Sequence, residues 1–169
     1  MTLLRALLFP ACVLLGACAS PPAPSATAST LYLVRHAEKD LAAGKDPPLT
    51  PAGRTRAERL STLLAKVPLE AIYSTATQRT RQTAAPTAQA HGLAILEYDA
   101  SDAVTFASQL RQRYPHGNVL IIGHSNTLPA LARALCHCTV GEMDEATYGI
   151  RYTVQFDSAG RSQLQVNQD

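Results

Sequence analysis

Two histidines and two arginines, each close behind a short apolar run, are the residues whose types and spacing point to chemistry. They are Arg35, His36, Arg79 and His124. The runs 31–34 and 119–122 have the length and composition of buried strands. Ligands of open α/β sheets bind beyond the carboxyl ends of the strands, where such side chains would meet. Arginine presents a planar fork that matches phosphate oxygens, and histidine can act as a nucleophile. The pattern therefore predicts a site for a phosphorylated ligand.

Strand-like runs alternate with helical segments, which predicts a three-layer α/β/α fold around a mostly parallel sheet. Four strands are expected, at 31–34, 71–73, 94–96 and 119–122. The last is the most apolar and is expected to lie centrally. Alternating residues in 150–156 and 164–166, on either side of a Ser-Ala-Gly turn, predict a C-terminal hairpin at the sheet edge.

Capping residues mark where the helices should begin and end. Thr50 followed by Pro51 predicts an N-terminus. Ser74 or Thr75 is expected to cap a helix that runs to His91 and ends at Gly92. This helix contains Pro86, which should kink or break it. A further helix is expected after Ser101 or Asp102, and another after Thr127.

The blocks that carry these residues resemble those of the histidine phosphatase (phosphoglycerate-mutase-like) superfamily. Leu-Val-Arg-His-Ala-Glu at 33–38 is similar to the block around the family's first histidine. The segment 73–84 resembles its second block, with Arg79 at the arginine position. Gly-His-Ser-Asn at 123–126 matches the block around the second histidine, and 49–53 fits the start of the first helix. The resemblance extends from Thr30 to about Leu135.

The resemblance implies a role for each site residue. His36 would be the nucleophile and would form a transient phosphohistidine that water then cleaves. To attack, its ring must be neutral, with the other ring nitrogen donating to a backbone carbonyl. Arg35, Arg79 and His124 would hold the phosphoryl oxygens and neutralise the charge that develops on them. No metal and no cofactor is implied.

The general acid is where the chain departs from the family. The tryptophan-containing glutamate motif of larger members is missing, and the sequence holds no tryptophan. Asp102, Asp99 and Glu38 are the candidate acids, although Asp102 is equally well placed as a helix N-cap. The insertion that covers the site in larger members is also missing. These features favour an open cleft for a phosphorylated small molecule or phosphoprotein, and they disfavour a mutase. A protein that binds phosphate ligands with little turnover is the alternative.

The first residues have the composition of an export signal. Residues 1–17 carry one charge and an apolar run too short to span a bilayer comfortably. Leu-Gly-Ala-Cys at 15–18 resembles a bacterial lipobox, in which Cys18 would be lipidated. Ordinary cleavage near this point and an uncleaved anchor are the alternatives. Residues 18–29 read as a Pro/Ala/Ser tether and 30–169 as the domain. We therefore expect an envelope lipoprotein on the periplasmic side, with the outer membrane favoured.

The net charge and the cysteines bear on three further questions: a nucleic-acid partner, a zinc site and a disulfide. A net charge of +2 without a basic run argues against a nucleic-acid partner. Cys136 and Cys138 flank a histidine, which is too few ligands for a typical zinc site. Two free thiols are the simpler expectation, because a bridge across one residue is geometrically demanding. An oxidising compartment would nonetheless allow a disulfide.

Overall fold

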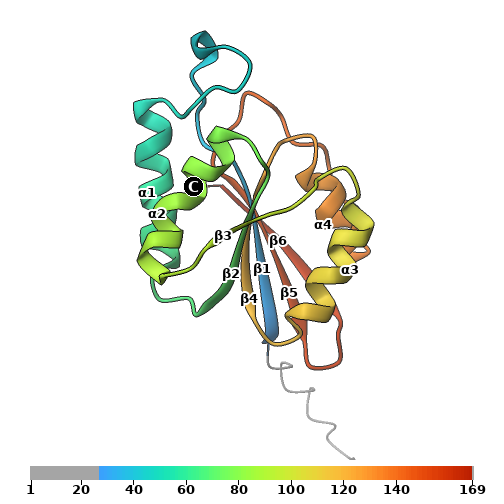
Figure 1. Ribbon diagram of the computed structural model, residues 1–169. Coiled ribbons are helices and arrows are strands. Elements are labelled where there is room, and N and C mark those ends of the chain that lie inside the picture. Colours follow the sequence, from blue (N-terminus) through green and yellow to red (C-terminus); the bar gives the residue numbers. More distant parts are fainter. Residues whose placement is uncertain (1–26, 169) are drawn as a thin grey trace, which may run out of the picture.

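The computed structural model describes residues 27–168, which form three layers with a mixed six-stranded sheet in the middle (Figure 1). The strand order is β3-β2-β4-β1-β5-β6. The strands are β1 (Thr27–Arg35), β2 (Leu69–Ser74), β3 (Ile95–Glu97), β4 (Asn118–Gly123), β5 (Ile150–Asp157) and β6 (Ser162–Gln168). β1 to β4 are parallel, whereas β5 runs antiparallel to β1 and β6 antiparallel to β5. The expected α/β architecture and its edge hairpin are confirmed.

The helices cover both faces of the sheet. They are α1 (Pro51–Leu64), α2 (Gln78–His91), α3 (Ala103–Arg113) and α4 (Leu128–Cys136), with a short 3₁₀ helix η1 (Leu41–Ala43) after β1. In Figure 1, α1 and α2 lie on one face and α3 and α4 on the other. None of the helices within residues 27–168 is both long and apolar enough to cross a bilayer.

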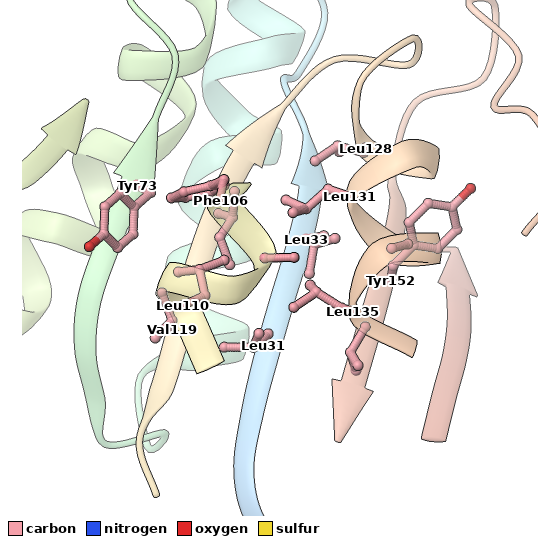
Figure 2. Close-up of a cluster of buried hydrophobic side chains, with 14 of the residues drawn as sticks. Leu31, Leu33, Tyr73, Phe106, Leu110, Val119, Leu128, Leu131, Leu135 and Tyr152 are labelled. Atoms are coloured by element: carbon pink, nitrogen blue, oxygen red, sulfur yellow. The ribbon is translucent and has the colours of Figure 1, made fainter. Parts of the chain in front are cut away.

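Two apolar clusters hold these layers together. On the α3/α4 face, leucines of both helices pack against side chains that alternate along β1, β4 and β5 (Figure 2). Leu31 and Leu33 of β1 point to this side, and Tyr32 and Val34 point to the other, as the two-residue period of a strand requires. β4 lies between β2 and β1, and its residues 119–122 are fully buried. Its expected central position is confirmed.

Helix starts were predicted with mixed success. Thr50 caps α1 as expected, its Oγ1 accepting from the Gly53 N–H at 3.1 Å. The prediction for α2 was wrong at its start, because this helix begins at Gln78 rather than after Ser74 or Thr75. The expected break at Pro86 is also absent, since α2 continues to His91 before Gly92 ends it with a φ of 64°.

The N-terminal signal, Cys18 and most of the expected tether lie outside the described residues. β1 begins at Thr27, three residues before the expected start of the domain, and Thr27 pairs with Asp157 of β5.

Cys136 and Cys138 form a disulfide, so the simpler expectation of two free thiols was wrong. α4 ends at Cys136, and His137 adopts a left-handed backbone with φ 52°. This turn brings the Cα atoms of the two cysteines to 5.1 Å, within the range that a disulfide spans.

Candidate functional site

The two histidines meet at the carboxyl ends of β1 and β4, the neighbouring strands at the centre of the sheet. Their rings are 5.3 Å apart between centroids and meet edge to face. The backbone fixes this pairing, because the His36 N–H donates to the Gly123 carbonyl at 3.0 Å. The sequence-based expectation that two strand ends deliver their histidines to one place is confirmed.

His36 is held with one ring nitrogen occupied and the other available. It is 3% exposed, and its Nδ1 lies 2.8 Å from the Ala37 carbonyl oxygen. A carbonyl can only accept, so Nδ1 carries the proton and Nε2 keeps its lone pair. The neighbouring Ala37 N–H donates to Thr83 Oγ1 of α2 at 3.0 Å, which fixes the turn. The predicted bond from His36 to a backbone carbonyl is present.

Both histidines are neutral at ordinary pH. Burial lowers the pKa of His36 to about 4, against the opposing effect of the Ala37 hydrogen bond and with the help of His124, Arg35 and Arg79. Burial, followed by the charges of Arg79, Lys39 and Arg35, lowers the pKa of His124 to about 4 as well. A neutral His36 can attack phosphorus, and a neutral His124 presents an N–H rather than a charge.

These lowered values predict a distinctive pH dependence. We expect the NMR signals of both rings to stay in the neutral form from pH 7.5 down to about 5, and to titrate near pH 4. Unfolded histidine titrates near 6.5 and so binds protons that the folded site refuses. Folding stability should therefore fall as pH drops from about 6.5 towards 4. Titration of either ring near 6.5, assigned with His36→Ala and His124→Ala, would contradict this prediction.

Arg35 makes contacts with a distant loop that the resemblance did not imply. Its Nη1 donates to the carbonyls of Asp144 and Thr147 at 2.9 and 2.7 Å, and Nη2 donates to that of Glu145 at 2.7 Å. Whether Arg35 also holds phosphoryl oxygens stays a prediction. The Tyr148 ring lies 4.4 Å from the guanidinium carbon. Three of the five N–H groups of the Arg35 guanidinium thus anchor the loop before β5.

Two guanidinium N–H groups of the site are buried without a partner among the described residues. They are Nε of Arg35 and Nε of Arg79. Buried donors are rarely left unpaired, because an unsatisfied one costs about 1–3 kcal/mol. Both arginines act electrostatically on both histidines. The positive charges of these two arginines favour the binding of an anion beside the histidines.

Arg79 stands in the first turn of α2, where an acidic residue from a distant loop meets it. Arg79 Nη1 lies 3.5 Å from Asp46 Oδ1. The same carboxylate accepts the Gln78 N–H at 3.0 Å and so caps α2, because the Thr77 side chain makes no capping bond. Asp46 therefore holds both the helix start and the arginine beside it.

A threonine orients His124. Thr75, at the end of β2, has its Oγ1 hydrogen-bonded to His124 Nε2 at 2.9 Å. Thr75 Oγ1 also lies 3.0 Å from Thr80 Oγ1, inside α2. Both threonines are buried. We expect Thr75→Val, which keeps the shape and removes the hydroxyl, to lower kcat about fivefold, since one neutral hydrogen bond is worth about 1 kcal/mol. A kcat within a factor of two of wild type would contradict this role.

The three candidate acids are each engaged elsewhere. Asp102 caps α3 through its bond to the Thr105 N–H, and this bond lowers its pKa. Asp99 is likewise held by Ser101, and Glu38 by two-pronged contacts with Arg56, which also lower their pKa values. Asp99 and Asp102 line a hollow of about 710 Å³ between β3 and α3 whose lining includes neither histidine. An acid needs a raised pKa, so the cap interpretation is the better account of Asp102.

The structure adds groups that the sequence motifs did not point to. Tyr148 lies edge-on to His36 at 6.2 Å between ring centroids. The Glu145 carboxylate accepts a hydrogen bond from Ser125 Oγ at 2.9 Å, and this carboxylate is only slightly buried. Lys39 lowers the pKa of His124 and of Glu145 through its charge, so it borders the site rather than belonging only to a solvated loop. Glu145 and Tyr148 lie in the loop before β5. This loop follows the last segment that resembles the family, and no local sequence pattern identifies its residues as part of a site.

A comparison with family models finds a match over residues 31–102, to the histidine phosphatase superfamily (branch 1). This segment contains Arg35, His36 and Arg79. This part of the chain, residues 31–102, is similar to the histidine phosphatase superfamily. The family-model match and the shared fold both indicate a phosphatase.

Solved structures share the histidine phosphatase fold over their whole length. The protein histidine phosphatase SixA, complexed with tungstate, is 20% identical with a TM-score of 0.70, covering 82% of this chain and 96% of its own. YhfR of Bacillus stearothermophilus is 22% identical with a TM-score of 0.69, covering 84% and 98%. A mycobacterial glucosyl-3-phosphoglycerate phosphatase is 17% identical with a TM-score of 0.66, covering 82% and 98%. No curated protein matches the sequence.

Proposed function

We propose that this chain is a metal-independent phosphatase that hydrolyses phosphomonoesters or phosphohistidine through a covalent phosphohistidine on His36. The observation that carries the proposal is the pairing of a neutral, correctly oriented nucleophile with unpaired cationic donors. His36 Nε2 keeps its lone pair because Nδ1 is bonded to the Ala37 carbonyl, and neither Nε of Arg35 nor Nε of Arg79 has a hydrogen-bond partner within residues 27–168.

The first step forms a bond between Nε2 and phosphorus and breaks the bond from phosphorus to the leaving group, which departs with the electron pair. The guanidinium groups of Arg35 and Arg79 lower the energy of the charge on the phosphoryl oxygens in this transition state. His124 contributes an N–H donor. A bound dianion would offset the arginine field that now opposes protonation of His124, and so would favour its charged form.

In the second step, water attacks phosphorus, and the phosphorus–nitrogen bond breaks as its electron pair returns to Nε2. The proton lost by the water leaves with phosphate or solvent. Among the carboxyl groups considered within residues 27–168, none is poised to protonate a poor leaving group, because Asp102, Asp99 and Glu38 are held ionised by their partners. The hydrogen bond from Ser125 likewise lowers the pKa of Glu145, the carboxyl group beside the histidines. Substrates whose leaving groups need little protonation are therefore favoured.

This reasoning predicts a leaving-group preference. In EDTA, the full chain should hydrolyse p-nitrophenyl phosphate and phosphoimidazole at least about 100-fold faster, in kcat/KM, than a simple alkyl phosphate, which is the low end of what a general acid contributes. Comparable rates on alkyl and aryl phosphates would show that an acid is present after all. Loss of all turnover in EDTA would exclude the metal-independent mechanism.

The occupied carboxylates also favour a second candidate, a protein that binds a phosphorylated ligand with little turnover. Phosphate or vanadate would then raise the melting temperature of the full chain, while none of the three substrates would be consumed at a measurable rate. Stabilisation together with turnover decides for the enzyme.

The natural substrate class is a phosphorylated small molecule or a phosphoprotein. The names of two structural neighbours point to a protein histidine phosphate and to glucosyl-3-phosphoglycerate as their substrates. The sequence of residues 1–29 supports an envelope location on the periplasmic side, with a lipid on Cys18 as the membrane link. Metabolic labelling with a palmitate analogue, lost in Cys18→Ser, tests this anchor.

A further inference from the structure

The two edge strands of the sheet differ in length and in charge. β3 forms one edge with only three residues, and its last residue, Glu97, is paired with Arg81. Short, charged edges discourage pairing with another chain. β6 forms the other edge with seven residues, Ser-Gln-Leu-Gln-Val-Asn-Gln, none of them charged and none proline. Within residues 27–168, no strand pairs with β6 on its outer side.

The side chains of β6 sort cleanly between the two faces of the sheet. Leu164 and Val166 stand opposite Val154 and Tyr152 of β5, on the face that α4 covers. Gln163, Gln165 and Asn167 stand on the other face, opposite the alternate residues of β5. Val166 is 62% exposed, which is unusual for a valine in a strand that packs beside a core.

We propose that β6 pairs with β6 of a second copy of this chain, antiparallel and about a two-fold axis at Gln165. Seven residues are symmetric about Gln165, so this register pairs the whole strand. Leu164 then stands opposite Val166 of the partner, Gln163 opposite Asn167, and Gln165 opposite itself. Apolar residues meet apolar ones, and amides meet amides that can hydrogen-bond across the strands. Moving the axis by two residues would place Leu164 or Val166 opposite a polar residue.

Charge makes the second copy the occupant that fits. A two-fold axis at Gln165 brings this residue close to its own copy, so a charge at this position would repel itself, and β6 carries no charge. The partner strand would also cover the exposed Val166 and satisfy the outward-facing backbone groups of β6. A single strand pair is smaller than a standard interface of about 1,600 Å², so the dimer should be weak and depend on concentration.

Sedimentation of the full chain in a density-matched detergent, over a range of micromolar concentrations, tests the proposal. We expect a monomer–dimer equilibrium. Gln165→Lys places two like charges directly opposite each other and should weaken the dimer about fivefold. Gln165→Glu should do the same, and an equal mixture of the two variants should associate at least as well as wild type. Only a contact of residue 165 with itself gives this rescue.

Gln89→Lys is the matched control, because it adds the same charge at an exposed position of α2, a helix that packs on β2, β3 and β4 rather than on β6. It should leave the dimer unchanged. A monomeric wild-type chain at every concentration would overturn the proposal. It would also be overturned by a dimer that resists Gln165→Lys, which would indicate association through another segment, or by a mixture that fails to restore association.

Discussion

His36→Ala is expected to lower the turnover of p-nitrophenyl phosphate about 10⁴-fold or more, since removing a covalent nucleophile eliminates the reaction path itself. The affinity for vanadate or phosphate should change far less. Their donors would be Nε of Arg35, Nε of Arg79 and the His124 ring, and the variant leaves all three in place. Steady-state kinetics and the rise in melting temperature with vanadate measure the two quantities separately.

His116→Ala is the control for this variant, because His116 is an exposed histidine in the loop before β4. It should match wild type in both measurements. Rapid acid-free quenching with labelled substrate should trap label on the wild-type chain and none on His36→Ala. Turnover that survives the loss of His36 would show that water attacks the substrate directly, and the covalent mechanism would be wrong.

Gly53→Ala is expected to have the largest effect on stability. Gly53 lies in the first turn of α1, and a Cβ there would stand 2.3 Å from the carbonyl oxygen of Glu38, an atom of the backbone. That same oxygen accepts the Thr50 N–H at 2.9 Å, so it cannot move without losing a capping contact. The helix must shift away from the turn that follows His36. We expect a loss of about 3 kcal/mol and a fall in melting temperature of roughly 10 °C, measured by calorimetry.

Two other glycines show that the cost is specific. A Cβ at Gly117 would also lie too close to another group, at 2.5 Å, but that group is the side-chain carboxylate of Glu70, which can rotate away. A Cβ at Gly141 meets nothing within 4 Å. Gly117→Ala and Gly141→Ala should each change stability by less than about 1 kcal/mol. Equal destabilisation in all three variants would mean that loss of glycine, rather than contact with Glu38, is responsible.

The sequence predicted those parts of the fold that depend on short-range patterns. Runs such as 119–122 are recognisable because a strand buried on both faces must be continuously apolar. The histidines were located for a related reason, since parallel strands deliver their last residues to one edge of the sheet. The cap at Thr50 is also a local signal, because it needs only the N–H groups of the following turn.

What the sequence did not predict depends on distant partners. The start of α2 was placed too early because its capping acceptor is Asp46, which lies 32 residues before Gln78. The hydroxyls at 74 and 75 that suggested a cap serve other bonds, that of Thr75 being with His124. The loop contacts of Arg35 were missed for the same reason. The partners of Arg35 are backbone carbonyl groups, which every residue carries. The residue types at 144–147 therefore could not reveal these contacts.

The contacts of Arg35 also bear on how the protein reaches its working state. Its carbonyl partners lie 109 to 112 residues away along the chain. Contacts between such distant segments close large loops. They form late in folding, because the chain must lose the entropy of loop closure before these contacts stabilise it. A chain that has completed only the first four strands would hold both histidines but would lack the anchor of its arginine. Enzymatic activity should therefore appear in the last kinetic phase of refolding, later than the secondary structure.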